Sequence, residues 1–181
     1  STVTVTDSVL TGHRTETFGG AIQVVAGDLF VRTSKFSANS AGRGGAIAVT
    51  DAGVEISDSE FHDNAASADG GALALDQPRS LSVTGADFSG NTVLGQGGAV
   101  YVGGAPATHS SVSGSTFIGN SAGNEGGALF VGASIDARAD GPAFTLDANR
   151  FEDNVGLVGG AVASDFAAVR VTGGEFAGNR A

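Results

Sequence analysis

Residues 61–64 read FHDN and residues 70–73 read GGAL, and this pair of motifs recurs along the chain. The first motif is Phe-x-x-Asn, and the second is Gly-Gly-Ala followed by an aliphatic residue. Phe-x-x-Asn occurs at Phe36/Asn39, Phe61/Asn64, Phe88/Asn91, Phe117/Asn120, Phe151/Asn154 and Phe176/Asn179. Gly-Gly-Ala begins at Gly19, Gly44, Gly70, Gly97, Gly126 and Gly159. Leu10 and His13 occupy the Phe and Asn positions of a degenerate first copy. A motif pair that recurs at this interval is typical of repeat architectures.

The segments between the motifs alternate apolar and polar residues with period two. Examples are Val54-x-Ile56 before Phe61 and Leu73-x-Leu75 after the glycine pair. This period predicts β-strands with one buried face. A unit of about 25 residues with short strands cannot bury its own core, so it must stack on its neighbours. A propeller is disfavoured because a blade needs about 40 residues. We therefore predict an all-β fold, a right-handed parallel β-helix of about seven coils with ~25 residues per coil.

Each repeated residue has a structural role in such a coil. The Phe positions should form an inward column, and the burial of each ring contributes roughly 1.5–3 kcal/mol. The Asn positions should form a second column at a corner, because asparagine tolerates left-handed backbone angles and its amide can bond its neighbours along the axis. The glycine pair is expected where φ is positive or the backbone is crowded. None of these residues is expected to be catalytic.

Together the two motifs resemble the repeats of the chlamydial polymorphic membrane proteins. They are also similar to repeats of secreted bacterial β-helix proteins of the pectin-lyase-like class. The resemblance runs from Leu10 to Asn179. It implies a surface-exposed passenger or adhesin-like region. Since the chain shows no secretion signal and no anchor, we expect residues 1–181 to be a single β-helix domain, a segment of a longer or assembling protein.

Composition narrows the classes of partner. The net charge is −10 and Lys35 is the single lysine, so a nucleic-acid partner is not expected, because phosphate binding needs a basic stripe. Cysteine is absent, which excludes disulfides and thiolate metal sites. No apolar run approaches the roughly 18 residues of a membrane helix, so no membrane span is predicted in this chain.

A catalytic site is not apparent, and we predict that the chain is not an enzyme and has no cofactor. We expect the strand after Gly-Gly-Ala to show a flat apolar outer face without titratable groups. Its outward positions are expected at Gln23, Ala48, Ala74, Tyr101, Phe130 and Ala163, beside an alanine column at Ala21, Ala46, Ala72, Ala99, Ala128 and Ala161. The strand before each Phe shows a solvated polar face with scattered carboxylates, unlike the paired acids of a glycosidase. The acid group Asp58, Glu60 and Asp63 is interpreted as solubilising.

Metal ligands are not expected either. His13, His62 and His109 share no ligand spacing, and no metal site is predicted. Adventitious calcium at Glu152/Asp153 or Asp136/Asp140 remains open.

Two features are candidate binding sites. The first is the corner after the Gly-Gly-Ala strand, where insertions from Gly103 to His109 and from Gly132 to Ala143 leave adjacent coils; their candidate residues are His109, Asp136, Arg138 and Asp140. The alternative is neutral variation in loop length. The second is the apolar face with Tyr101 and Phe130, because a contiguous apolar surface often marks an interface. The alternative is that alanine simply lets the sheet turn tightly.

Three functions stay open from the sequence. The first is a structural or adhesin-like segment of an extracellular or cell-surface protein. The second is an extracellular filament subunit that assembles head to tail. The third is a glycan-binding β-helix, with cleavage less favoured than binding. The expected partner is a protein or glycan surface, or copies of the chain end to end.

Overall fold

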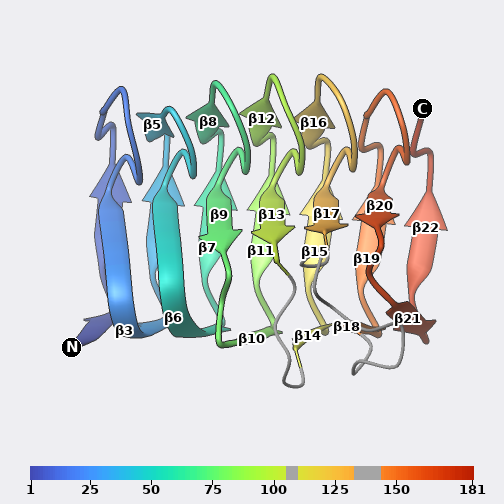
Figure 1. The fold of residues 1–181 in the computed structure, drawn as a ribbon. Coiled ribbons are helices and arrows are strands. Elements are labelled where there is room, and N and C mark those ends of the chain that lie inside the picture. The colour runs from blue at the N-terminus through green and yellow to red at the C-terminus, as the bar shows by residue number, and fades with distance from the viewer. Residues whose placement is uncertain (105–109, 133–143) are drawn as a thin grey trace.

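Every coil of the chain returns to the same sheets one level further along an axis, as the computed structural model shows for residues 1–104, 110–132 and 144–181 (Figure 1). Within these residues there is no helix, and the strands form sheets of eleven, seven and four strands. All of the paired strands are parallel, and partners lie one coil apart. The predicted all-β parallel β-helix is therefore confirmed.

The strands can be grouped by sheet. The seven-stranded sheet, called the Phe sheet below, contains β2 (Val9–Thr11), β4 (Lys35–Ser37), β7 (Glu60–His62), β11 (Asp87–Ser89), β15 (Thr116–Ile118), β19 (Arg150–Glu152) and β22 (Glu175–Ala177). The four-stranded sheet contains β5 (Ser40–Ala41), β8 (Ala65–Ala66), β12 (Thr92–Val93) and β16 (Ser121–Ala122).

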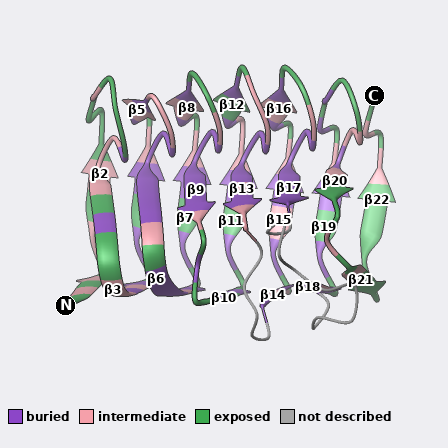
Figure 2. Ribbon diagram, in the orientation of Figure 1, coloured by how far each residue is buried: buried purple, intermediate pink, exposed green. Residues whose placement is uncertain are grey.

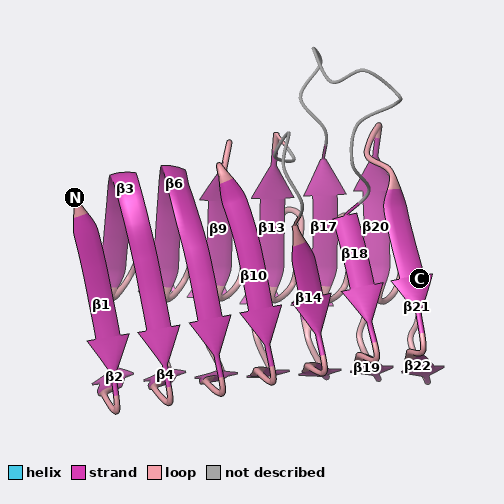
Figure 3. Cartoon of the chain, turned by 90° about the horizontal axis from the view of Figure 1, so that it is seen from below, coloured by secondary structure: helices cyan, strands magenta, loops and turns pink. Residues whose placement is uncertain are grey.

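The eleven-stranded sheet bends around a corner and forms two faces. The front face contains residues 22–25 of β3 (Ile22–Arg32) and 47–50 of β6 (Ile47–Ser57), then β9 (Leu73–Asp76), β13 (Val100–Gly103), β17 (Leu129–Gly132) and β20 (Val162–Asp165). The polar face contains β1 (Thr2–Thr6), the second halves of β3 and β6, β10 (Ser80–Thr84), β14 (Ser111–Ser113), β18 (Phe144–Asp147) and β21 (Val169–Thr172), which lie side by side in Figure 3. β3 and β6 thus each run through both faces as one strand, whereas each later coil has a separate strand on each face.

The coil count differs slightly from the prediction. The chain makes about six turns of about 27 residues, rather than about seven coils of ~25. A complete turn runs from one Phe-sheet strand to the next, so the seven strands of this sheet enclose only six complete turns. The average turn is longer because the connections at residues 104–110 and 133–143 exceed the three-residue connection at 77–79.

The phenylalanines form the predicted inward column. Neighbouring rings along the column stack with centroids 4.7–5.0 Å apart and planes within 15° of parallel. The rings that are at most 1% exposed are Phe36, Phe61, Phe88, Phe117 and Phe151. Phe176 in the last coil is 47% exposed, and the burial colouring shows the same change along the axis (Figure 2). Each ring is therefore buried by the coil that follows it.

The asparagines form the predicted ladder at the corner after the Phe sheet. The backbone N–H and the side-chain Nδ2 of Asn64 both donate to Oδ1 of Asn91, at 3.0 Å each. Nδ2 of Asn64 also donates to the carbonyl of Phe36, one coil back, at 3.0 Å. Each asparagine therefore bonds to the coil before it and to the coil after it.

Asn120 repeats this geometry one coil further along the axis. The backbone N–H and Nδ2 of Asn91 donate to Oδ1 of Asn120 at 3.0 and 2.9 Å. Nδ2 of Asn120 donates to the carbonyl of Phe88 and to Oδ1 of Asn154, at 3.0 Å each. The side chain of Asn120 is fully buried, as are those of Asn91 and Asn154. These contacts confirm Asn120 as a member of the ladder.

The backbone reason given for asparagine at this corner is wrong. Asn120 does not adopt a positive φ, and neither does any other asparagine of the ladder. The left-handed residue is instead the one before it, with φ of 61° at Gly119, 62° at Gly90 and 53° at Asp63. Because the preceding residue makes the turn, the asparagine side chain can point inward and hydrogen-bond along the axis. Asparagine is therefore required here for its carboxamide rather than for its backbone tolerance.

The two glycines of each pair differ in backbone conformation. The first adopts a positive φ, for example 66° at Gly70 and 70° at Gly97. The second is crowded, since a Cβ on Gly71 would lie 2.0 Å from the carbonyl oxygen of Gly98. The first position is crowded as well, since a Cβ on Gly70 would lie 2.1 Å from the carbonyl oxygen of Leu73. Both predicted reasons for glycine therefore apply.

We predict that Asn91→Ala destabilises the fold by about 2–4 kcal/mol. The substitution removes the acceptor of two buried donors of Asn64 and the donor to the Phe61 carbonyl, and each unsatisfied buried group costs about 1–3 kcal/mol. Urea denaturation followed by circular dichroism measures the change. The exposed Asn124 gives the control, and Asn124→Ala should change stability by less than about 0.5 kcal/mol. Equal effects of the two substitutions would contradict the role of the ladder.

Candidate binding surface

Tyr101 and Phe130 lie beside each other on the front face, on neighbouring strands β13 and β17. Their rings stack with centroids 5.5 Å apart and planes 6° from parallel. Phe130 is only 4% exposed, however, and the neighbouring outward positions Ala48 and Ala74 are also buried. At Ala48, Ala74 and Phe130 the expectation of an exposed apolar surface is therefore wrong, whereas Tyr101 is partly exposed.

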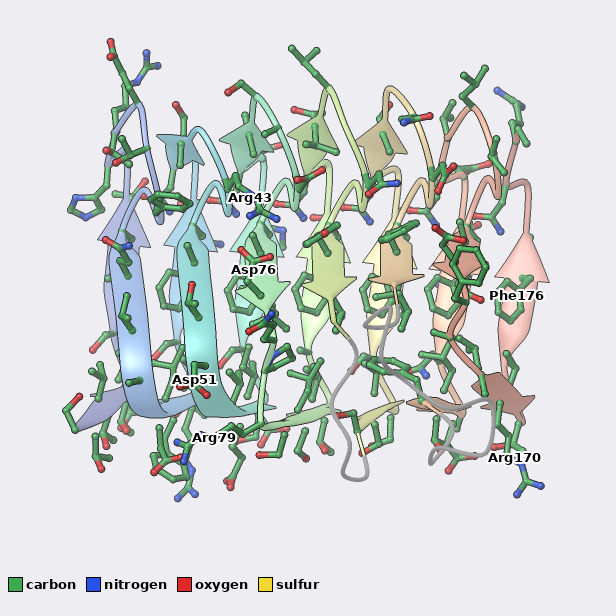
Figure 4. The ribbon with its side chains drawn as sticks, viewed as in Figure 1. Arg43, Asp51, Asp76, Arg79, Arg170 and Phe176 are labelled. Atoms are coloured by element: carbon green, nitrogen blue, oxygen red, sulfur yellow. The ribbon has the colours of Figure 1, made fainter. Side chains whose placement is uncertain are left out.

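One arginine covers part of this face. Arg43 comes from the corner before Gly44, and its Nη1 and Nη2 donate to the two carboxylate oxygens of Asp76 at 2.6 and 3.0 Å (Figure 4). Its guanidinium carbon lies 5.1 Å from the centre of the Tyr101 ring. Its buried Nε lies 3.2 Å from Asp69, but not in a direction that makes a hydrogen bond. We call Arg43, Asp69, Asp76 and Tyr101 the Arg43 clip.

The clip joins three successive coils. A further side-chain hydrogen bond continues along the corner that precedes the glycine pairs. Arg43 belongs to the second Gly-Gly-Ala repeat, Asp69 and Asp76 to the third, and Tyr101 to the fourth. In the positions before the next glycine pairs, Gln96 Nε2 donates to Glu125 Oε2 at 3.1 Å. Alanine at positions 48 and 74 gives the arginine room to cross the face. The expectation that this face carries nothing that titrates is also wrong, because the clip contains two carboxylates.

Most of the alanine column points inward rather than outward. Ala46, Ala72, Ala99 and Ala128 are fully buried in the hydrophobic core. The cause is local: the N–H groups of Ala21 and Ile22 both donate to the carbonyl of Ala46. Side chains therefore alternate strictly between the inner and outer faces only after the alanine. The sequence pattern did not predict this offset.

The polar face carries hydroxyls and individually paired charges. Ser82, Ser111 and Thr145 are in register on neighbouring strands. Arg32 lies 2.7 Å from Glu55, and Thr172 donates to Asp147 at 2.6 Å. Each of these carboxylates thus has a neutralising or hydrogen-bonding partner on the same surface.

The other predicted site residues are those of the two insertions and of the calcium candidates. His109, Asp136, Arg138 and Asp140 lie outside the described residues, as does the Asp136/Asp140 calcium candidate. Glu152 of the second calcium candidate is paired with Arg150 on its own strand. Within the described ranges, no group of three or more acidic or histidine side chains could hold a metal ion.

A serine ladder, two residues before the Phe positions, was not predicted. The backbone N–H of Ser34 donates to Ser59 Oγ at 3.1 Å, and each of these hydroxyls donates to the carbonyl two residues before it. The signal was present as Ser-x-Phe at Ser34, Ser59 and Ser115. It is a structural feature, since these side chains are buried.

The two long insertions leave and rejoin adjacent strands. β13 pairs with β17 before the insertions, and β14 pairs with β18 after them. The third coil makes the same connection with Gln77, Pro78 and Arg79 alone. We call the corner between the front face and the polar face the front corner. Neighbouring coils with the same strand pairing differ most in length at this corner.

The fold defines a parallel β-helix of stacked repeats, and comparison with known families identifies the repeat. Residues 85–103 and 114–132 match the Chlamydia polymorphic membrane protein repeat. The chain thus carries this repeat in two consecutive coils, as its motifs predicted. No curated protein and no solved structure matches the chain. None of the residues that the structure describes forms a helix long and apolar enough to cross a membrane.

We predict a raised pKa for Tyr101. Burial of the phenol raises its pKa, and the Asp69 carboxylate adds to the shift. Because the folded chain holds this proton more tightly than the unfolded chain, the contribution of Tyr101 to stability is constant below the pKa of an unfolded tyrosine, about 10, and is lost as pH rises above it. Tyr101 is the sole tyrosine, so phenolate absorbance reports on it alone. Asp69→Asn should lower the titration midpoint, and a midpoint no higher than that of the urea-unfolded chain would contradict the burial.

We predict that Arg43→Met destabilises the chain by about 1–3 kcal/mol, because the charged hydrogen bonds to Asp76 and the contact with Tyr101 are lost. Arg32→Met is the matched control. Arg32 is 53% exposed and pairs with one exposed carboxylate, so its loss should cost about 0–1 kcal/mol in the same urea titration. An Arg43 effect no larger than the Arg32 effect would show that the clip is not a structural contact.

Proposed function

We propose that the chain is a surface-exposed, adhesin-like β-helix segment, located at the cell surface or outside the cell. The observation that carries this proposal is the match of two consecutive coils to the polymorphic membrane protein repeat. The family of this repeat is that of the Chlamydia polymorphic membrane proteins, which associates the repeat with a membrane protein. The residues that repeat serve the stacking of coils, so the recognition of a partner is left to residues that vary between coils.

We place the recognition site at the two insertions of the front corner. The matched stretches stop at Gly103 and Gly132, the last residues of β13 and β17, where the insertions begin. The repeat thus accounts for the scaffold, and the insertions are additions to it at neighbouring positions. Loops on a rigid scaffold are where binding residues concentrate. His109, Asp136, Arg138 and Asp140 are the candidate contacts.

The Arg43 clip favours the insertions over the Tyr101 face. One side of the Tyr101 ring stacks on Phe130 and the guanidinium of Arg43 lies over the ring, so neither side is open to a partner. The acids of the clip are also engaged with Arg43. We therefore propose that the chain binds its partner without enzymatic turnover. The partner is a protein or glycan surface, and a nucleic acid does not suit a chain of net charge −10.

The test is binding of the fluorescently labelled chain to fixed mammalian epithelial cells. In the variant, residues 77–81 of the third coil replace residues 104–110, and residues 77–80 replace residues 133–143. Both connections are then shortened to the length that the strand register of the third coil already uses. Binding should fall at least about tenfold in this variant, and it should persist in Arg43→Met.

Treatment of the cells separates the two partner classes. Trypsin should remove a protein partner, and periodate should remove a glycan partner. The absence of binding by the unaltered chain contradicts the adhesin-like function. Full binding by the shortened variant, with circular dichroism unchanged, would instead place the site elsewhere on the solenoid.

A further inference from the structure

Three side chains on the outer surface of the Phe sheet form one hydrogen-bonded chain. His62 lies between the other two: its Nδ1 contacts Ser89 Oγ, and its Nε2 lies 3.1 Å from Glu60 Oε2. Lys35 Nζ lies 3.1 Å from the same carboxylate oxygen. In the sequence Glu60 was interpreted as a solubilising acid and His62 showed no ligand spacing, so this arrangement was not predicted.

The solenoid brings these residues together through its register. Glu60 and His62 are two residues apart on β7, so they share the outer face of that strand. Ser89 on β11 is the register partner of His62, one coil further on. Neighbouring strands lie about 4.8 Å apart, a separation that one imidazole ring spans. His62 and Ser89 are both partly exposed, so a small molecule in solution can reach them.

The Glu60 carboxylate favours the tautomer of His62 that carries its proton on Nε2. The ion pair with Lys35, together with the hydrogen bond from His62, holds the pKa of Glu60 below its usual range. Glu60 is therefore a carboxylate at neutral pH and accepts a proton-bearing Nε2. A neutral imidazole protonated at Nε2 has an acceptor at Nδ1, so the Ser89 hydroxyl donates to it. This order of hydroxyl, imidazole and carboxylate is the one that activates a serine nucleophile.

We propose that Ser89 is a nucleophile that accepts an acyl group from a small ester, with His62 as its general base and Glu60 as the positioning residue. Ser89 Oγ forms a bond to the acyl carbon while its proton passes to Nδ1 of His62. The ester C–O bond breaks, and the departing alkoxide takes that proton from His62. The products are acylated Ser89 and a free alcohol. This covalent site goes beyond the non-covalent recognition assigned to the front corner.

The surroundings of Ser89 favour a single acylation over turnover. Catalysed acyl transfer relies on free N–H donors for the developing oxyanion, and each is worth about 10²–10³ in rate. Two N–H groups that adjoin the pair are engaged: that of Gly90, which follows Ser89, donates to the Ile118 carbonyl, and that of Asp63, which follows His62, donates to the carbonyl of Ser89 itself, each at 3.0 Å. The acyl group should therefore accumulate on Ser89, because its hydrolysis lacks the same stabilisation.

The fold supplies a matched control on the other side of His62. Ser37 on β4 is also a register partner of His62 and is also partly exposed. Its hydroxyl donates to Thr11 Oγ1 at 3.1 Å rather than to the imidazole. Ser37 and Ser89 thus differ in hydrogen bonding to His62 more than in position.

The test is incubation of the folded chain with p-nitrophenyl acetate, followed by intact mass measurement and peptide mapping. We expect one acetyl group on Ser89, none on Ser37, no acetylation of this peptide in Ser89→Ala, and an unchanged rate in Ser37→Ala. His62→Gln should slow acetylation of Ser89 by about 100-fold or more, since a general base contributes about 10²–10⁴. Glu60→Gln should slow it by about tenfold, and Glu60→Asp should restore part of the rate, which a merely structural role of the carboxylate would not do.

Circular dichroism of each variant establishes that the solenoid is retained. The proposal is overturned if Ser89 in the folded chain reacts no faster than Ser37, or than Ser89 in the urea-unfolded chain. It is equally overturned if the acetyl group stays on His62, or if His62→Gln leaves the rate unchanged. Peptide mapping separates these results from acetylation of Lys35 or of the terminal amine.

Discussion

The structure depends on a constraint of register: each residue must hydrogen-bond to its counterpart one coil away. The Asn64–Asn91–Asn120 steps show this most directly, because the carboxamide of Asn91 accepts two hydrogen bonds from the previous coil and donates to that coil and the next. A one-residue shift would separate these partners and also move the phenylalanines off their stack. The Phe column, the serine ladder and the glycine pairs all follow from this register. Lengths can vary only where a connection leaves the stack, which is why the insertions occur at the front corner.

The sequence was sufficient for the architecture because the residues that build it recur. Phe61, Asn64 and the pair Gly70–Gly71 each have counterparts in neighbouring coils, and their spacing predicted which residues stack. The coil count was less accurate, because counting the Phe positions counts strands rather than complete turns. The alanine column was misplaced because the shared carbonyl of Ala46 delays the alternation of faces by one residue. Periodicity describes a regular strand and carries no signal for such an irregular pairing.

The candidate sites were harder to predict because they depend on contacts that occur once. Arg43 and Asp76 are 33 residues apart, a separation that is not one repeat, and an arginine can reach several neighbouring positions. Ser89 and His62 are 27 residues apart, which is one coil, so their proximity follows from the register once the strands are aligned. What the sequence could not provide is the hydrogen bonding: Ser37 is equally close in register, yet its hydroxyl bonds to Thr11. Atomic positions are needed to decide which of the two register partners, Ser37 or Ser89, hydrogen-bonds to His62.

The asparagine ladder has a further electrostatic consequence. From Asn39 to Asn154 every step donates in the same direction, toward Oδ1 of the following coil. The carboxamide dipoles are therefore aligned head to tail along the axis, and each polarises the next in a buried, low-dielectric environment. Their sum is a dipole with its positive end toward Asn179, analogous to the macrodipole of a helix although the chain uses strands. The solenoid is thus electrically polar along its length, a property that neither its net charge nor its repeat pattern expresses.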